Sequence, residues 1–231
     1  MVYGNDIYEC PDNNFPKIRN VIVTAVDMSK TGQLPVDLGI SIGRVVKGFL
    51  VSAIVGVVLG SAMGMSETAK ELLLPTITTI RQIPMIAWIP LIILWAGIGE
   101  ASKVIIIVIA AVFPILVNTM SGITGTPKGY VEVAKLYKLG RWQTFTKVFL
   151  PHALPQMLVG LKLGLGVSWM AVVASELIAA TSGIGYRMNE ARSLMRSDKV
   201  IVCMIVIGIV GILMDKVISV IFEKNNTLDT N

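Results

Sequence analysis

The sequence has few residues that carry covalent or metal chemistry. Its 231 residues include only two cysteines and one histidine. Cys10 and Cys203 lie far apart, so we expect neither a disulfide nor a ligand role, and we expect Cys203 to be a small buried side chain. His152 has no second histidine and no cysteine cluster to join, so no metal site is expected.

Enzyme motifs are missing as well. The chain has no Walker glycine loop with its lysine, so we do not expect it to hydrolyse ATP itself. No nucleophile, base and orienting group occur as a set, and no metal-ligand spacing is found. We therefore expect no cofactor and no enzyme activity, and an intramembrane enzyme is the weakest alternative.

Charge is also scarce. Charged residues make up 15% of the chain and hydrophobic residues 54%, with a net charge of +5. A soluble domain of this length does not need so much apolar surface. The cations lie in loops beside apolar runs and not in one stripe with interleaved aromatic residues, so no nucleic-acid partner is expected. Membrane orientation is the simpler cause of the positive charge.

Apolar runs long enough to cross a membrane are what the sequence does contain, since a spanning helix needs about 20 residues. No alternation typical of a membrane barrel occurs, and isolated backbone polar groups are not tolerated in lipid, so helices are expected. The predicted spans are 48–65, 83–98, 104–122, 159–180 and 200–213. The expected fold class is an all-α membrane protein, a polytopic helical bundle of about five spans.

Polar segments flank these spans. Residues 1–20 have no apolar core, so they predict neither a signal peptide nor a span. Residues 15–41 predict one or two short helices on the membrane surface with a turn at 32–35. We therefore divide the chain into a polar and membrane-surface segment (1–47), a transmembrane domain (48–222) and a frayed C-terminal tail (223–231).

Small residues recur in the first predicted span at every fourth position, which lets another helix approach closely. These residues are Ser52, Gly56, Gly60 and Gly64. Packing within one bundle is favoured over a dimer signal. The second span contains Pro84 and Pro90, which break the helical hydrogen bonds, so it should be buried or line a cavity. Arg81 and Lys103, at span ends, are expected to reach the membrane surface.

Four residues are candidates for a translocation path or gate. Glu176 lies inside a predicted span, where an ionisable group costs about 2.5–3.5 kcal/mol, so it should face the bundle interior. It is either a gating residue or a carboxylate held by a neighbouring hydroxyl or backbone group. The second is favoured, because an ionised glutamate repels an anionic substrate. Pro90, Trp95 and Trp169 are the other candidates, although core and interfacial packing explains the tryptophans equally well.

The segment 126–155 is polar and cation-rich, between two apolar runs. Its apolar positions fall at helical spacing in two groups. These are Val131, Ala134, Leu136 and Leu139, then Trp142, Phe145, Val148 and Phe149. The pattern predicts two short helices, with Gly140 ending the first in a left-handed turn and Leu150-Pro151 stopping the second. An ordinary solvated connection is the alternative to a docking element.

Glu132-Val133-Ala134, followed at the expected spacing by Leu150-Pro151, resembles the EAA loop of permease subunits of bacterial ABC importers. That loop is the cytoplasmic element that docks into the ATPase subunit. The family usually has glycine at the position of Lys138, so the elbow is expected to be shifted or shaped differently. The docking residues implied by the resemblance are Glu132, Ala134, Gly140, Trp142, Leu150 and Pro151.

Further motifs are similar to one branch of these permeases, that of taurine, aliphatic sulfonate and nitrate or bicarbonate importers. They are residues 81–90, 94–103, 182–186 and 189–192, and the resemblance covers residues 15–223. The branch usually has one more span before this region, so we expect either a five-span form or a start codon placed too late.

The resemblance implies a permease subunit of type I importer fold in the bacterial cytoplasmic membrane. Its implied partners are an ABC ATPase subunit, a solute-binding protein, a second copy or a paralogous permease, and membrane lipid. A sulfonate or taurine is the first expectation for the solute, then nitrate or bicarbonate, then a pyrimidine resembling a thiamine precursor. The alternative is a membrane scaffold that docks an ATPase but does not conduct.

Overall fold

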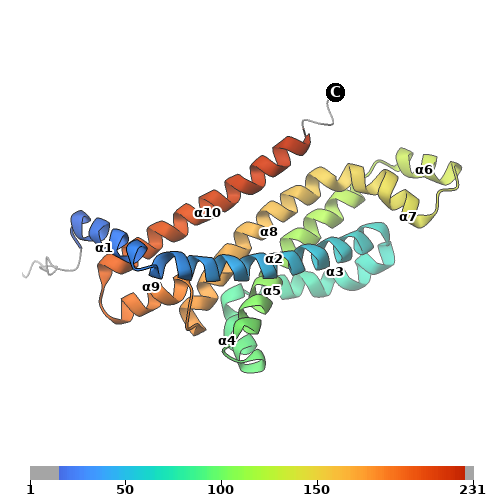
Figure 1. Cartoon of the computed structure of the whole chain (residues 1–231). Coiled ribbons are helices and arrows are strands. Elements are labelled where there is room, and N and C mark those ends of the chain that lie inside the picture. The colour runs from blue at the N-terminus through green and yellow to red at the C-terminus, as the bar shows by residue number, and fades with distance from the viewer. Residues whose placement is uncertain (1–15, 227–231) are drawn as a thin grey trace, which may run out of the picture.

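The computed structural model describes residues 16–226, and every regular element in that range is helical (Figure 1). Cys10 and the end of the predicted tail lie outside it. The elements are α1 (Ile18–Lys30), α2 (Gln33–Met65), α3 (Glu67–Gln82), α4 (Met85–Ala96), α5 (Glu100–Thr124), α6 (Lys128–Leu136), α7 (Arg141–Thr144), the π-helical turn η1 (Phe145–Phe149), α8 (Leu150–Ala179), α9 (Ile184–Ser193) and α10 (Ser197–Asn226).

Within residues 16–226, four stretches are long and apolar enough to cross a membrane: α2, α5, the continuous helix 141–179, and α10. Helices α3 and α4, bent by 97° at their junction, make a fifth if they form one broken span. This confirms the predicted all-α membrane bundle. In Figure 1 the long helices run along the molecule, with α1 and α9 at one end and α6 and α7 at the other.

The contact between α2 and α5 is made by the small residues that the sequence singled out. A Cβ atom on Gly60 would lie 2.6 Å from the carbonyl oxygen of Leu116, and one on Gly64 would lie 2.7 Å from Cβ of Ile123. Only glycine allows the two backbones to come this close. The prediction that these residues serve packing within one bundle is confirmed.

The N-terminal part of α2 differs from the prediction. A turn occurs at Gly32, whose φ is 75°, but the residues after it form no separate surface helix. They continue into the first span, because their polar side chains are buried and paired inside the protein. These side chains belong to Asp37, Ser41 and Arg44. Residue 48 thus lies inside α2, while the division of the chain into three parts stays a prediction.

The prediction that Leu150-Pro151 stops a short helix is wrong. The helix continues through the π-helical turn η1 into α8, which ends only at Ala179. In that turn the N–H of Leu150 donates to the carbonyl of Phe145, five residues earlier. A wider turn leaves room for a proline ring that would otherwise clash with the preceding turn, so Pro151 is accommodated.

Candidate functional site

The segment from α6 to η1, here called the hairpin, projects from one end of the bundle (Figure 1). Ala134 is buried on its inner side, whereas Glu132 is exposed. Large apolar side chains are exposed as well: Leu136 by 81%, Tyr137 by 78% and Trp142 by 74%. Apolar groups gathered outside the spanning helices are typical of a contact surface for another protein.

The elbow of the hairpin is built at Lys138 and not at Gly140. The N–H of Lys138 donates to the carbonyl of Lys135, and the N–H of Leu139 donates to that of Ala134. This pair of bonds is the Schellman pattern that ends helices with a left-handed residue. Lys138 is that residue, with a φ of 52°. The prediction for Gly140 is therefore wrong, because its φ is −66° and it is the N-cap residue that precedes α7.

The remaining predicted docking residues fall along this segment. Glu132 and Ala134 lie on α6, and Trp142 lies on α7 with its ring 5.7 Å from that of Phe145. Leu150 and Pro151 open α8. The chain thus places all six at one end of the molecule, and their part in docking stays a prediction.

The opposite end holds a buried cluster of charged and polar groups. Nη1 of Arg44 donates to Oε1 of Glu176 at 2.7 Å and to the carbonyl of Ser182 at 2.8 Å. The guanidinium also pairs with Glu100 at the start of α5. The Ser41 hydroxyl and the N–H of Gly185 donate to the Glu176 carboxylate. Four segments of the chain meet in this cluster.

Asp37 extends the cluster toward α9. Its carboxylate accepts from Nε of Arg187 at 2.7 Å and from the N–H of Gly183 at 3.1 Å. Burial is the largest single effect and lowers the pKa of the Arg187 guanidinium, but the hydrogen bonds and negative charges of Asp37 and Glu190 together outweigh it, so the pKa is raised. Asp37, Ser41 and Arg44 were not among the predicted site residues, although their spacing of four and three residues places them on one face of a helix.

The four candidate path residues do not form one group. Glu176 is held by a hydroxyl, a guanidinium and a backbone N–H, an arrangement of the kind favoured from the sequence. Trp169 is buried and donates to the carbonyl of Ile207 on α10. Pro90 lies inside α4, and Trp95, near the end of that helix, is 73% exposed. Their role in a path or gate stays a prediction.

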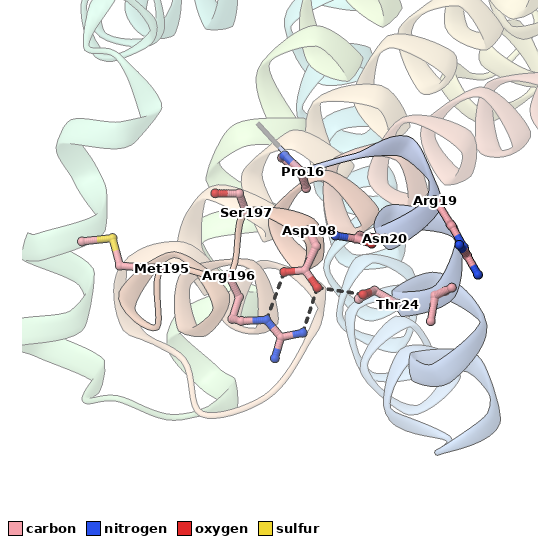
Figure 2. A pocket seen from close by; sticks show the side chains of 9 residues that line it. Pro16, Arg19, Asn20, Thr24, Met195, Arg196, Ser197 and Asp198 are labelled. Atoms are coloured by element: carbon pink, nitrogen blue, oxygen red, sulfur yellow. Dashed lines mark hydrogen bonds and ion pairs between the residues drawn. The ribbon is translucent and has the colours of Figure 1, made fainter. Parts of the chain in front are cut away.

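A polar pocket of about 510 Å³ lies at the same end as the buried cluster, between α1 and the connection from α9 to α10 (Figure 2). Asp198 accepts from the Thr24 hydroxyl at 2.7 Å and from Nη2 of Arg196 at 2.8 Å. The first of these bonds ties α1 to the start of α10.

The chain belongs to the family of binding-protein-dependent transport system inner membrane components, whose model matches residues 52–224. More narrowly, it is an ABC transporter permease subunit and a multi-pass membrane protein. Because its relatives are permeases, it is a transport component and not an enzyme.

Three relatives show how far this similarity extends. A putative ABC transporter permease, MJ0413 of Methanocaldococcus jannaschii, is 42% identical and covers 84% of this chain and 73% of its own. The putative aliphatic sulfonates transport permease SsuC of Escherichia coli is 37% identical, and the match covers 87% of this chain and 76% of SsuC. The nitrate import permease NrtB of Synechocystis is 34% identical, and the match covers 80% of this chain and 68% of NrtB.

Solved structures show the same fold at low sequence identity. An amino acid ABC transporter chain matches with a TM-score of 0.69 at 16% identity, covering 86% of this chain and 97% of that one. A chain of the inward-facing MetNI methionine transporter matches with a TM-score of 0.59 at 17% identity, covering 78% and 93%. The architecture is therefore that of type I importer permeases.

Proposed function

We propose that this chain is the permease subunit of an ATP-driven importer for a small oxyanion. A sulfonate such as taurine is the first choice of solute, and nitrate or bicarbonate the second. Relatives named for aliphatic sulfonates, taurine and nitrate match at 34–37% identity, and the chemistry that their solutes share is a small anionic group.

One observation carries the mechanism: the second half of the hairpin is continuous with a spanning helix. Residues 141–179 run without a break from Trp142, on the exposed hairpin, to Glu176, in the buried cluster at the other end. Helix α8 also packs closely on α5, where a Cβ atom on Gly160 would lie 2.7 Å from Cβ of Asn118. A rigid helix held in this way transmits a push on the hairpin to the far end of the bundle.

The partners follow from this arrangement. The hairpin would face the cytoplasm and receive an ABC ATPase subunit. The end formed by α1 and α9 would then lie outside and meet a solute-binding protein. A second copy or a paralogous permease would complete the path, so that the solute passes between the two subunits in a bacterial cytoplasmic membrane.

Co-purification of the ATPase subunit from detergent-solubilised membranes tests the docking. We expect the wild-type chain to retain the ATPase and Glu132→Arg to lose it, because the substitution reverses an exposed charge on α6. Asp27→Arg is the matched control, since Asp27 is exposed on α1 at the other end of the molecule. Absence of the ATPase from the wild-type preparation would remove the main support for an importer.

Uptake of labelled taurine, ethanesulfonate and nitrate by reconstituted vesicles tests conduction. The vesicles contain the chain with its ATPase and its solute-binding protein. ATP-dependent uptake is the expected result. Intact ATPase docking with no uptake of any of the three solutes would favour the non-conducting scaffold.

A further inference from the structure

The junction of α3 and α4 forms one side of a pocket that is partly open to the surface, since Arg81, Ile83 and Pro84 on its rim are exposed. The two helices meet at 97°, and the pocket beside this bend has a volume of about 290 Å³. Apolar side chains from α4, α5 and α8 form most of its wall, among them Trp88, Phe113 and Val167. Arg81, in the last turn of α3, is the only charged residue among the described residues that line it.

This pocket lies at about half the depth of the bundle. Ala110 and Pro114, which line it, are each ten residues from an end of α5, or about 15 Å at the rise of an α-helix. Helix α3 packs Leu74 and Ile77 toward the hairpin end of α5, whereas α4 packs Ile89 and Ile92 toward the other end. The bend between them therefore lies beside the middle of α5, with the exposed Arg81 next to it, and the prediction that Arg81 reaches the membrane surface stays a prediction.

Arg81 has no carboxylate partner here. Among residues 16–226 it takes part in no ion pair, unlike Arg44 and Arg187. A cation at mid-depth with apolar neighbours is costly unless it faces water or an anion. Such residues in spanning segments mark routes for ions and solutes.

The helix start beside Arg81 adds to the positive character. Pro84 and Met85, at the beginning of α4, line the same pocket, and α4 runs for 12 residues away from it. The positive end of a helix that begins in mid-membrane favours an anion in front of it, as in other transporters built with broken helices.

From these observations we propose that Arg81 and this pocket bind the anionic head of the solute at the membrane midplane. The inference rests on the proposed import of a small oxyanion and gives it a site. The planar guanidinium donates in parallel to two oxygens of a sulfonate or nitrate. The apolar wall around Trp88 and Phe113 suits the short aliphatic part of a sulfonate, and the volume suits a small solute.

Tryptophan fluorescence tests the site directly, because nitrate quenches tryptophan on contact and Trp88 lines the pocket. The full chain, in complex with its ATPase in bilayer discs of zwitterionic lipid, is titrated with sodium nitrate. We expect a saturable quenching component that Trp88→Phe removes and that ethanesulfonate displaces. Discs that contain anionic lipid form a second arm. If an anionic lipid headgroup binds Arg81, the saturable quenching disappears in these discs, which would overturn the assignment to solute.

Variants of Arg81 decide the role of its charge. Arg81→Gln should raise the half-saturating nitrate concentration at least about tenfold. Arg81→Lys should raise it by a smaller factor, since lysine keeps the positive charge but cannot donate in parallel to two oxygens. Lys70→Gln, which removes a cation from the same helix outside the pocket, should titrate as wild type. Equal titration of Arg81→Gln and wild type, or no saturable component in wild type, would overturn the proposal.

Uptake and ATPase retention, measured on the same preparations, separate this inference from the proposed function. Saturable binding with no uptake would keep the site and remove the importer. Uptake that is the same in Arg81→Gln and wild type would keep the importer and remove the proposed site.

Discussion

Nη1 of Arg44 lies 2.7 Å from Oε1 of Glu176, and both side chains are almost completely withdrawn from solvent. The pair joins α2 to α8, and the contact of Arg44 with Glu100 adds the start of α5. The Ser182 carbonyl, in the loop before α9, and the N–H of Gly185, in the first turn of α9, bind the same two side chains. One buried ion pair thus fixes the end of the bundle opposite the hairpin.

Removing one partner of this pair should be strongly destabilising. Glu176→Ala leaves Arg44 buried with only Glu100 as a counter-charge, and breaking a buried pair costs about 3–5 kcal/mol. We expect the lower part of that range, because Glu100 remains. Thermal unfolding in detergent measures it. Glu100→Ala is the matched comparison and should cost less, since the Glu100 side chain is 63% exposed; equal losses would contradict this account.

The sequence predicted the parts of this molecule that depend on local pattern. Apolar runs marked the spans in α2, α5, α8 and α10, whereas the predicted span 83–98 is the 12-residue α4, which could cross a membrane only together with α3. The spacing of glycines such as Gly60 marked the face of α2 that packs on α5. It did not predict that Asp37, Ser41 and Arg44 are buried, because their partners lie far along the chain. Polar residues in the first turns of a helix resemble a solvated surface until those partners are known.

The hairpin shows that residue pattern alone can also mislead about a local turn. Glycine is the usual residue at a left-handed helix end, so Gly140 was the natural prediction. The backbone instead places the turn where the hydrogen bonds of α6 end, at Lys138, and a lysine adopts the less favourable conformation. The bend between α3 and α4 was not predicted for another reason, since only the folded chain shows that the end of α3 lies beside the middle of α5.

Glycine at position 60 should be required for the contact between α2 and α5. Gly60→Ala places a Cβ atom 2.6 Å from a backbone oxygen that cannot move aside by a rotamer change. We expect a loss of about 1–3 kcal/mol in stability, measured as a lower unfolding temperature. Gly43→Ala, in the same helix with open space around the new Cβ, should be neutral or slightly stabilising. Similar losses in both variants would show that helix packing is not the cause.

The elbow of the hairpin should be stabilised by a glycine at position 138. The left-handed conformation costs a residue with a side chain about 1 kcal/mol. Lys138→Gly keeps this conformation and removes that cost, so amide exchange at the end of α6 should slow about fivefold. Gly140→Ala is the control: its φ is −66° and a Cβ there meets nothing within 4 Å, so little change is expected. Faster exchange in Lys138→Gly would refute this assignment of the turn.

The attachment of α1 should depend on the Thr24 hydroxyl. It donates to the Asp198 carboxylate at 2.7 Å, across the junction between α1 and α10 (Figure 2). Thr24→Val keeps the shape and removes a hydrogen bond to a charged group, which contributes about 1.5–3 kcal/mol. Because Arg196 still pairs with Asp198, we expect the lower value and amide exchange in α1 about tenfold faster, with α8 unchanged. Ser29→Ala, which removes a bond to the backbone of α1 itself, should leave that exchange nearly unaltered. Equal exchange in Thr24→Val and wild type would mean that apolar packing alone holds α1 in place.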